Sequence, residues 1–259
     1  MSDPLLLRNV DGGVATLTMN RPDQFNSLSG ELLAELQHAL DDMAADSSVR
    51  AVVLAGAGKA FCAGHDLKQM RANHDKEYMR RLFRQCGRLM TKITSIPQPV
   101  IARVHGIATA AGCQLVASCD LAVAVETARF AVSGINVGLF CSTPAVALSR
   151  NVGRKQAMEM LLTGEFIDAP EAQRRGLVNR VVKPDTLDEE IRKLTASICE
   201  KSAAAVRLGK QLFYRQLEMG IDAAYQMASE TMACNMMFDD AGEGIDAFMA
   251  KRKPEWKNR

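Results

Sequence analysis

The sequence predicts an α/β protein whose last third is helical, and three observations lead to this fold class. Short β-branched or apolar runs at residues 52–54, 100–104 and 121–125 are separated by segments long enough for crossovers, so parallel strands are expected. Residues 29–43 repeat apolar side chains at helical spacing. From residue 185 onward strand signals fade and helical patterns recur. We therefore expect a first region over 1–184 and a helical region over 185–259.

The individual elements follow in chain order. Residues 5–10 and 14–19 flank an Asp-Gly-Gly turn and are expected to pair as a hairpin. Ser29 is the expected N-cap of a helix whose apolar face contains Leu32, Leu33, Leu36, Leu40 and Met43. Further helices are expected over residues 187–198, 206–217 and 221–237. The Tyr and Met side chains of the last helix suit either a core or a subunit interface, and we expect a mixture of both.

Composition excludes several functional classes. The 259 residues are 47% hydrophobic and 24% charged with a net charge of +2, which gives no basis for binding nucleic acid. The seven cysteines form no CxxC pair and no cluster with histidines, so no metal site is expected. No apolar stretch is long enough for a membrane span. Reduced thiols and the lack of a secretion-signal pattern predict a cytoplasmic protein.

Two glycine-containing turns carry the functional argument. GAGKAFCAGHDLK (56–68) follows one predicted strand, and ATAAGCQ (108–114) follows the next and opens a predicted helix. The spacings GxxxxGK[ST] and GxGxxG are absent, so a nucleotide-binding loop is not expected. Two such turns at the ends of parallel strands could direct two backbone N–H groups at one oxygen, as an oxyanion hole requires. On spacing alone, ordinary strand-to-helix loops are the simpler interpretation.

Several stretches favour the oxyanion hole over ordinary loops, because together they resemble a known family. They are NRPDQFNSLS, AFCAGHDL, VHGIATAAGCQLVASCDLAVA, AMEMLLTGEFIDAPEAQRRGLVNRVV and EGIDAFMAKRKPEW. These segments span nearly the whole chain and resemble the crotonase superfamily, also called the enoyl-CoA hydratase/isomerase family, most closely its domain-containing subgroup. The resemblance implies a spiral of ββα units followed by a helical trimerisation region, assembled as a homotrimer or a dimer of trimers. It also implies an acyl-CoA thioester as ligand, with no cofactor apart from the substrate's coenzyme A.

The resemblance also implies the site residues. By position, the paired oxyanion donors are the backbone N–H groups of His65 and Ala111. Lys251 and the helix containing Met232 would border the acyl pocket of a neighbouring subunit. The expected contacts to the acyl-CoA come from residues around both turns, namely Ala63, His65, Asp66, Leu67, Lys68 and Ala111.

The sequence departs from the family where hydratases carry two catalytic glutamates. Gln114 and Gly134 occupy those positions. Neither can ionise, and a lost general acid–base typically costs about 10² to 10⁴ in rate, so standard hydration is not expected. The backbone oxyanion hole would remain, which leaves lyase, isomerase or hydrolytic chemistry on acyl-CoA as the predicted function. The alternative is a non-catalytic acyl-CoA carrier, sensor or assembly protein.

A replacement reactive group would lie within residues 133–143. The candidates are Cys141, Ser142, Thr143 and Asn136, and some relatives place an aspartate nucleophile near the position of Ser142. Each has a simpler interpretation. Cys141 is expected to be a small buried apolar residue, Ser142 or Thr143 a helix N-cap, and Asn136 a loop residue bonded to its own backbone.

Three polar residues near the turns have structural interpretations as well. We expect His65 to act through its backbone N–H rather than its imidazole. His105 is expected to form a hydrogen bond at a strand end, and Asp66 to brace the turn rather than exchange protons.

Overall fold

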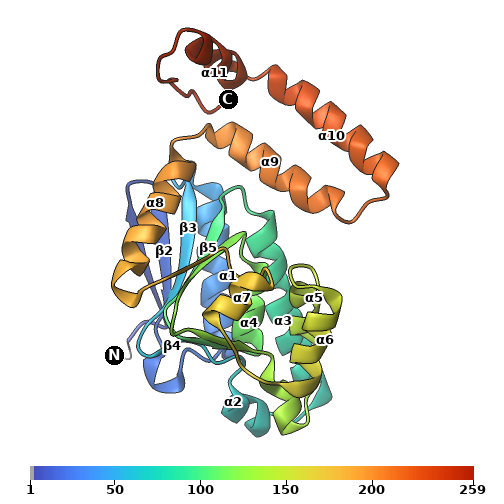
Figure 1. Cartoon of the computed structure of the whole chain (residues 1–259). Helices are drawn as coiled ribbons and strands as arrows, with labels where there is room; N and C mark the ends of the chain where they lie inside the picture. The colour runs from blue at the N-terminus through green and yellow to red at the C-terminus, as the bar shows by residue number, and fades with distance from the viewer. Residues whose placement is uncertain (1–2) are drawn as a thin grey trace.

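The computed structural model describes residues 3–259 and contains two sheets with helices packed around them (Figure 1). The larger sheet has the order β1-β2-β3-β5-β7-β10 and consists of β1 (Leu6–Asp11), β2 (Val14–Met19), β3 (Ala51–Gly56), β5 (Val100–Val104), β7 (Leu121–Val125) and β10 (Arg180–Val182). Strands β1 and β2 form the predicted antiparallel hairpin, in which Gly12 and Gly13 both have positive φ. The other pairs are parallel. This confirms the prediction for the strands at residues 52–54, 100–104 and 121–125, whereas β10 was not predicted.

The strands of the smaller sheet had no predicted counterpart in the residue pattern, and only the family resemblance implied a repeated ββα unit. Its order is β4-β6-β8-β9, and it consists of β4 (Ala60–Cys62), β6 (Ile107–Thr109), β8 (Arg129–Ala131) and β9 (Ile167–Asp168). Each of β4, β6 and β8 directly follows a strand of the larger sheet, and these three strands run parallel to one another. The chain therefore adds one strand to the larger sheet and then one to the smaller sheet before it enters a helix or helical turn. This ββα unit repeats along the fold.

Helices cover the sheets over the first two thirds of the chain. Ser29 caps the first helix as predicted, because its side chain accepts a hydrogen bond from the Leu32 N–H. The helices are α1 (Gly30–Ala45), α2 (Leu67–Ala72), α3 (Lys76–Ser95), α4 (Ala111–Ser118), α5 (Ser142–Leu148), α6 (Arg154–Thr163) and α7 (Ala169–Arg174), with short 3₁₀ turns at Pro22–Gln24, Ser133–Val137 and Pro184–Thr186. Helix α4 is buried throughout its length, so its N-terminus is held inside the protein.

The last part of the chain is helical, as predicted. It contains α8 (Leu187–Cys199), α9 (Ala203–Gln216), α10 (Ile221–Met236) and α11 (Asp239–Met249). Helix α8 contacts β3 and β7 of the larger sheet, whereas α9, α10 and α11 extend beyond the sheets at the top of Figure 1. The boundary expected at residues 184–185 remains a prediction. Within residues 3–259, no helix combines the length and apolarity needed to cross a membrane.

A buried ion pair fastens α9 to the sheet region. The Lys210 Nζ donates to Asp120 Oδ2 at 2.6 Å and to the backbone oxygens of Ile93 and Gln98 at 2.9 and 2.8 Å. The Tyr214 hydroxyl donates to Asp120 Oδ1 at 2.8 Å. Since a buried charge is tolerated only when it is paired and hydrogen-bonded, this cluster fixes where the C-terminal helices leave the core.

Candidate active site

The two glycine-containing turns lie against each other. Gly64, in the first turn, has a φ of +90°, a conformation that side chains disfavour. A Cβ added at Gly64 would lie 2.8 Å from the Ala110 Cβ and 3.2 Å from the Ala111 nitrogen. Gly112, in the second turn, packs so closely on Cys62 that a Cβ there would collide with the Cys62 carbonyl oxygen. Both contacts require glycine, and both bring the predicted donor positions together.

The backbone geometry leaves the His65 and Ala111 N–H groups available. Leu28 donates its N–H to the Gly64 oxygen at 2.7 Å and accepts from the Asp66 N–H at 3.1 Å. This parallel bridge uses the residues on both sides of His65, so the N–H of His65 itself points away from Leu28. Ala111 is the first residue of α4, where amides have no partner within the helix. No hydrogen bond from either amide occurs among the residues the structure describes.

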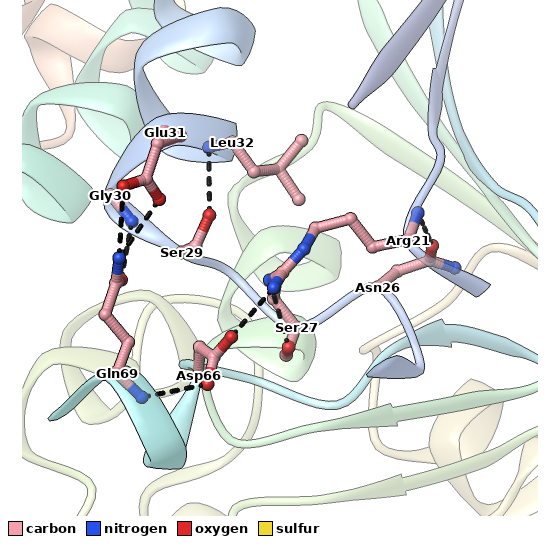
Figure 2. A network of polar contacts seen from close by, with 9 residues as sticks. All are labelled: Arg21, Asn26, Ser27, Ser29, Gly30, Glu31, Leu32, Asp66 and Gln69. Atoms are coloured by element: carbon pink, nitrogen blue, oxygen red, sulfur yellow. Dashed lines mark hydrogen bonds and ion pairs between the residues drawn. The ribbon is translucent and has the colours of Figure 1, made fainter. Parts of the chain in front are cut away.

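A polar network holds the first turn in place (Figure 2). Asp66 caps α2 by accepting the Gln69 N–H at 3.1 Å, and its other oxygen pairs with Arg21 at 2.8 Å. Burial alone would raise the pKa of Asp66, but the Arg21 guanidinium and nearby backbone N–H groups outweigh this effect and lower the pKa. Gln69 in turn accepts from the Gly30 N–H at 2.9 Å. The prediction that Asp66 braces the turn is confirmed.

A cavity of about 350 Å³ opens beside the two turns. Its wall is mostly apolar, which suits an acyl chain. The wall consists of Ala63, His65, Leu67, Met70, Phe83, Ala110, Ala111, Ser133, Gly134, Val137, Leu139, Phe140, Cys141, Ser142, Thr143 and Pro144. Four of the expected ligand residues, Ala63, His65, Leu67 and Ala111, are therefore brought together. Asp66 and Lys68 do not line this cavity, and their contact with coenzyme A remains a prediction.

The 133–143 loop also lines the cavity, and it is packed around Gly134 and Cys141. The Gly134 N–H donates to the Cys141 Sγ at 3.3 Å. A Cβ added at Gly134 would lie 2.7 Å from that sulfur and 2.6 Å from the Leu139 carbonyl oxygen. The sulfur and the loop backbone thus fill the space where a side chain at residue 134 would begin. Cys141 is buried as expected, and burial raises the pKa of its thiol.

Gln114 lies one turn beyond Ala111 but does not reach the cavity wall. It is buried in α4, and the Cys86 thiol donates to its side-chain oxygen in a long contact of 4.0 Å. The predicted placement of Gln114 in the reacting centre therefore has no support from the cavity lining, and its catalytic role remains a prediction.

Two interpretations of the 133–143 loop were wrong. Ser142 is the first residue of α5 rather than its cap, because Cys141 holds the cap position and makes no side-chain cap bond. The Ser142 hydroxyl instead donates to the Phe140 oxygen at 3.3 Å. Asn136 does not bond its own backbone, since its amide donates to the Gly164 oxygen at 3.4 Å. The hydroxyl-bearing residues Ser142 and Thr143 do line the cavity.

The two histidines differ in their surroundings. The His105 Nε2 lies 3.0 Å from the Gly58 oxygen, which confirms the expected strand-end hydrogen bond. The His65 ring packs edge-on against Phe83, with 5.4 Å between ring centroids. Met70 and Phe83, from α2 and α3, also reach the cavity wall and were missed, because no spacing within one segment signals contact between distant segments.

The chain is similar to known proteins over nearly its whole length. The enoyl-CoA hydratase/isomerase family matches residues 9–259. The chain belongs to the enoyl-CoA hydratase/isomerase family. A crystal structure of an enoyl-CoA hydratase from Mycobacterium smegmatis is 63% identical, with a TM-score of 0.97 over 98% of this chain and 99% of that one. The human enoyl-CoA hydratase domain-containing protein 3 is 42% identical, with a TM-score of 0.95 over 98% and 100%.

The likeness expected to the domain-containing subgroup of this family is also confirmed. The mitochondrial enoyl-CoA hydratase domain-containing protein 3 of Xenopus laevis is 45% identical over 98% of this chain and 86% of its own length. The names of this relative and of its zebrafish and human counterparts, which call them mitochondrial, contradict the prediction of a cytoplasmic location. That prediction rested on thiol content and the absence of a secretion signal, and neither distinguishes the cytosol from other reducing compartments.

Proposed function

We propose that this enoyl-CoA hydratase/isomerase family protein binds acyl-CoA thioesters and polarises their carbonyl group between the N–H groups of His65 and Ala111. The proposal is carried by two amides that have no hydrogen-bond partner within residues 3–259. They lie in two turns that contact each other, beside an apolar cavity of about 350 Å³. Two preorganised donors stabilise the negative charge that develops on a thioester oxygen, and one such donor is typically worth about 10² to 10³ in rate.

The chemistry we propose is enolate or acyl chemistry other than standard two-glutamate hydration. The described wall of the cavity contains no carboxylate, Gln114 does not line it, and the backbone at Gly134 leaves no room for a side chain. A water molecule there has no carboxylate to take its proton, whereas the two amides still stabilise an enolate. Isomerisation, bond cleavage adjacent to the carbonyl, or hydrolysis fits this arrangement.

Binding of two matched ligands tests the carbonyl contact. Butyryl-CoA and its thioether analogue S-butyl-CoA differ only in the carbonyl oxygen, and isothermal titration calorimetry compares their affinities. Two lost hydrogen bonds at about 1 kcal/mol each predict roughly 10-fold to 30-fold weaker binding of the thioether. Equal affinities would refute the proposed placement of the carbonyl.

A non-catalytic acyl-CoA carrier or sensor is the second candidate, and the absence of a carboxylate from the described cavity wall favours it. Turnover over a panel of acyl-CoA thioesters separates the two functions. Saturable binding without any product would support the carrier, whereas formation of any new acyl-CoA product or free CoA would establish the enzyme.

We also propose that the chain assembles as a homotrimer or a dimer of trimers through its C-terminal helices. Large apolar side chains on α9, α10 and α11 are exposed in the single chain, including Phe213, Tyr225, Met232, Met236 and Phe248. Exposed large apolar side chains gathered on a few neighbouring helices are typical of an interface. Sedimentation velocity at micromolar concentration should show three or six chains, and a monomer would contradict the proposal.

A further inference from the structure

The cavity wall contains one side chain suited to proton transfer near neutral pH. Within the described lining, the titratable side chains are His65 and Cys141, and the remaining polar ones are hydroxyls. Cys141 is held as a thiol, because burial raises its pKa and the Gly134 N–H opposes that effect only in part. His65 therefore differs from every other described wall residue in being able to accept a proton at pH 7.

The surroundings of the His65 ring leave it without a hydrogen-bonding role in the fold. Both ring nitrogens are buried, and neither has a partner among residues 3–259. Burial lowers the pKa of the imidazole, and the nearby Leu28 backbone offsets this only in part, so the surroundings favour the neutral ring. The adjacent Asp66 carboxylate is occupied by Arg21 and the α2 cap. Unpaired buried polar groups are rare and call for an explanation, of which a catalytic role is one.

We infer that the His65 imidazole is the catalytic base that removes a proton from the Cα of an acyl-CoA bound in this cavity. The inference rests on the proposed function. The Cα–H bond breaks, its electron pair forms the enolate whose oxygen is held by the His65 and Ala111 N–H groups, and the proton moves to a ring nitrogen. Return of the proton to Cα or to Cγ of an unsaturated acyl chain completes exchange or isomerisation. Both ring nitrogens are buried in this structure, so the step requires rotation about the Cβ–Cγ bond, a torsion with broad preferences in histidine, to turn one nitrogen toward the ligand.

Hydrogen–deuterium exchange at Cα tests the inference without knowledge of the natural substrate. Butyryl-CoA is incubated with the full-length protein in D₂O, and loss of the Cα proton signal is followed by NMR. His65→Ala removes the imidazole but keeps the backbone N–H, so it separates the base from the oxyanion donor. We expect affinity for butyryl-CoA within a few-fold of the wild-type value, exchange at least about 100-fold slower, and partial recovery on adding free imidazole. As the pH is lowered, the wild-type exchange rate should fall when the imidazole becomes protonated. Because burial lowers the pKa of His65, this fall should occur below pH 6.5.

Control variants keep the outcomes distinguishable. His38→Ala changes an exposed histidine on α1 and should exchange at the wild-type rate. His65→Gln, which preserves more of the side-chain volume, replaces His65→Ala if the latter misfolds by circular dichroism. Exchange at the wild-type rate in the His65 variant, or wild-type protein that binds butyryl-CoA without exchanging it, would overturn the inference while leaving the binding proposal intact. Failure of the wild-type protein to bind at all would refute the proposed function itself.

Discussion

Two regions line the cavity. Ala63, His65, Leu67, Ala110 and Ala111 from the two turns form the first wall, and residues of the 133–143 loop form a second wall with a thiol, hydroxyls and apolar side chains. The first wall is fixed by glycine contacts and by the Arg21–Asp66 pair. The second lacks a carboxylate, and its backbone closes around Gly134. The difference indicates that thioester binding and the reacting groups are separable properties of this fold, since substitution changes side chains but leaves amides in place.

The largest effect is expected from disturbing the backbone wall. Gly112→Ala places a methyl group against the Cys62 carbonyl, so α4 must move away from β4. We expect a loss of about 3 kcal/mol in the free energy of unfolding, together with loss of butyryl-CoA binding. Urea denaturation and calorimetry measure the two effects.

Gly209→Ala is the matched control, because it makes the same change in a helix with no atom within 4 Å of the new Cβ. It should stabilise the protein by up to about 1 kcal/mol and leave binding unchanged. Equal effects of the two variants would show that the packing of α4 on β4 is not what positions the Ala111 amide.

An intermediate effect is expected from restoring glutamates on the other wall. Gly134→Glu must displace either the Cys141 sulfur or the Leu139 carbonyl, which we expect to cost about 2 kcal/mol of stability. The double variant Gln114→Glu with Gly134→Glu should therefore fail to hydrate crotonyl-CoA. Spectrophotometric loss of the enoyl absorbance measures this, with Gln114→Glu alone as the control. Efficient hydration by the double variant would show that the 133–143 loop can accommodate a glutamate at residue 134, and that the second wall is not closed to hydratase chemistry.

A smaller effect is expected from loosening the brace behind the first turn. Arg21→Ala leaves the Asp66 carboxylate without its ion-pair partner in a partly buried site and should cost about 1 kcal/mol of stability. Butyryl-CoA binding should weaken by several-fold, because the His65 N–H loses part of its support. An unchanged dissociation constant would mean that the Leu28 bridge alone positions His65.

The smallest effect is expected at the thiol of the second wall. Burial keeps Cys141 protonated, so alkylation by iodoacetamide at pH 7.5 should be slow compared with alkylation of the exposed Cys234. Peptide mass spectrometry after timed labelling reports both rates in one sample. Rapid alkylation of Cys141 would identify a reactive thiolate and would assign the chemistry of this wall to sulfur.

The elements predicted from the sequence are those that carry their own local signal. The Gly12–Gly13 hairpin, the helix capped by Ser29 and the parallel strands around Val52 and Val100 were predicted and are present. Strands β4, β6, β8 and β9 have only two or three residues each, too few to show a period, and the second sheet was missed.

The same distinction between local and long-range signals applies to the residues that line the cavity. The His65 and Ala111 turns follow strands and could be located from spacing and resemblance. In contrast, Phe83 reaches the wall from a distant helix, and the contact between Gly134 and Cys141 depends on how a loop folds back on itself. A hydroxyl before a proline-containing helix is typical of an N-cap and predicts that role for Ser142 or Thr143, yet the helix begins at Ser142 itself.

A crystal structure of the protein with butyryl-CoA tests the central claim most directly. The account predicts the thioester oxygen about 2.7 to 3.1 Å from both the His65 and the Ala111 nitrogen, with the acyl chain in the apolar cavity. A carbonyl bound elsewhere, or the two amides engaged in hydrogen bonds within the protein, would contradict it.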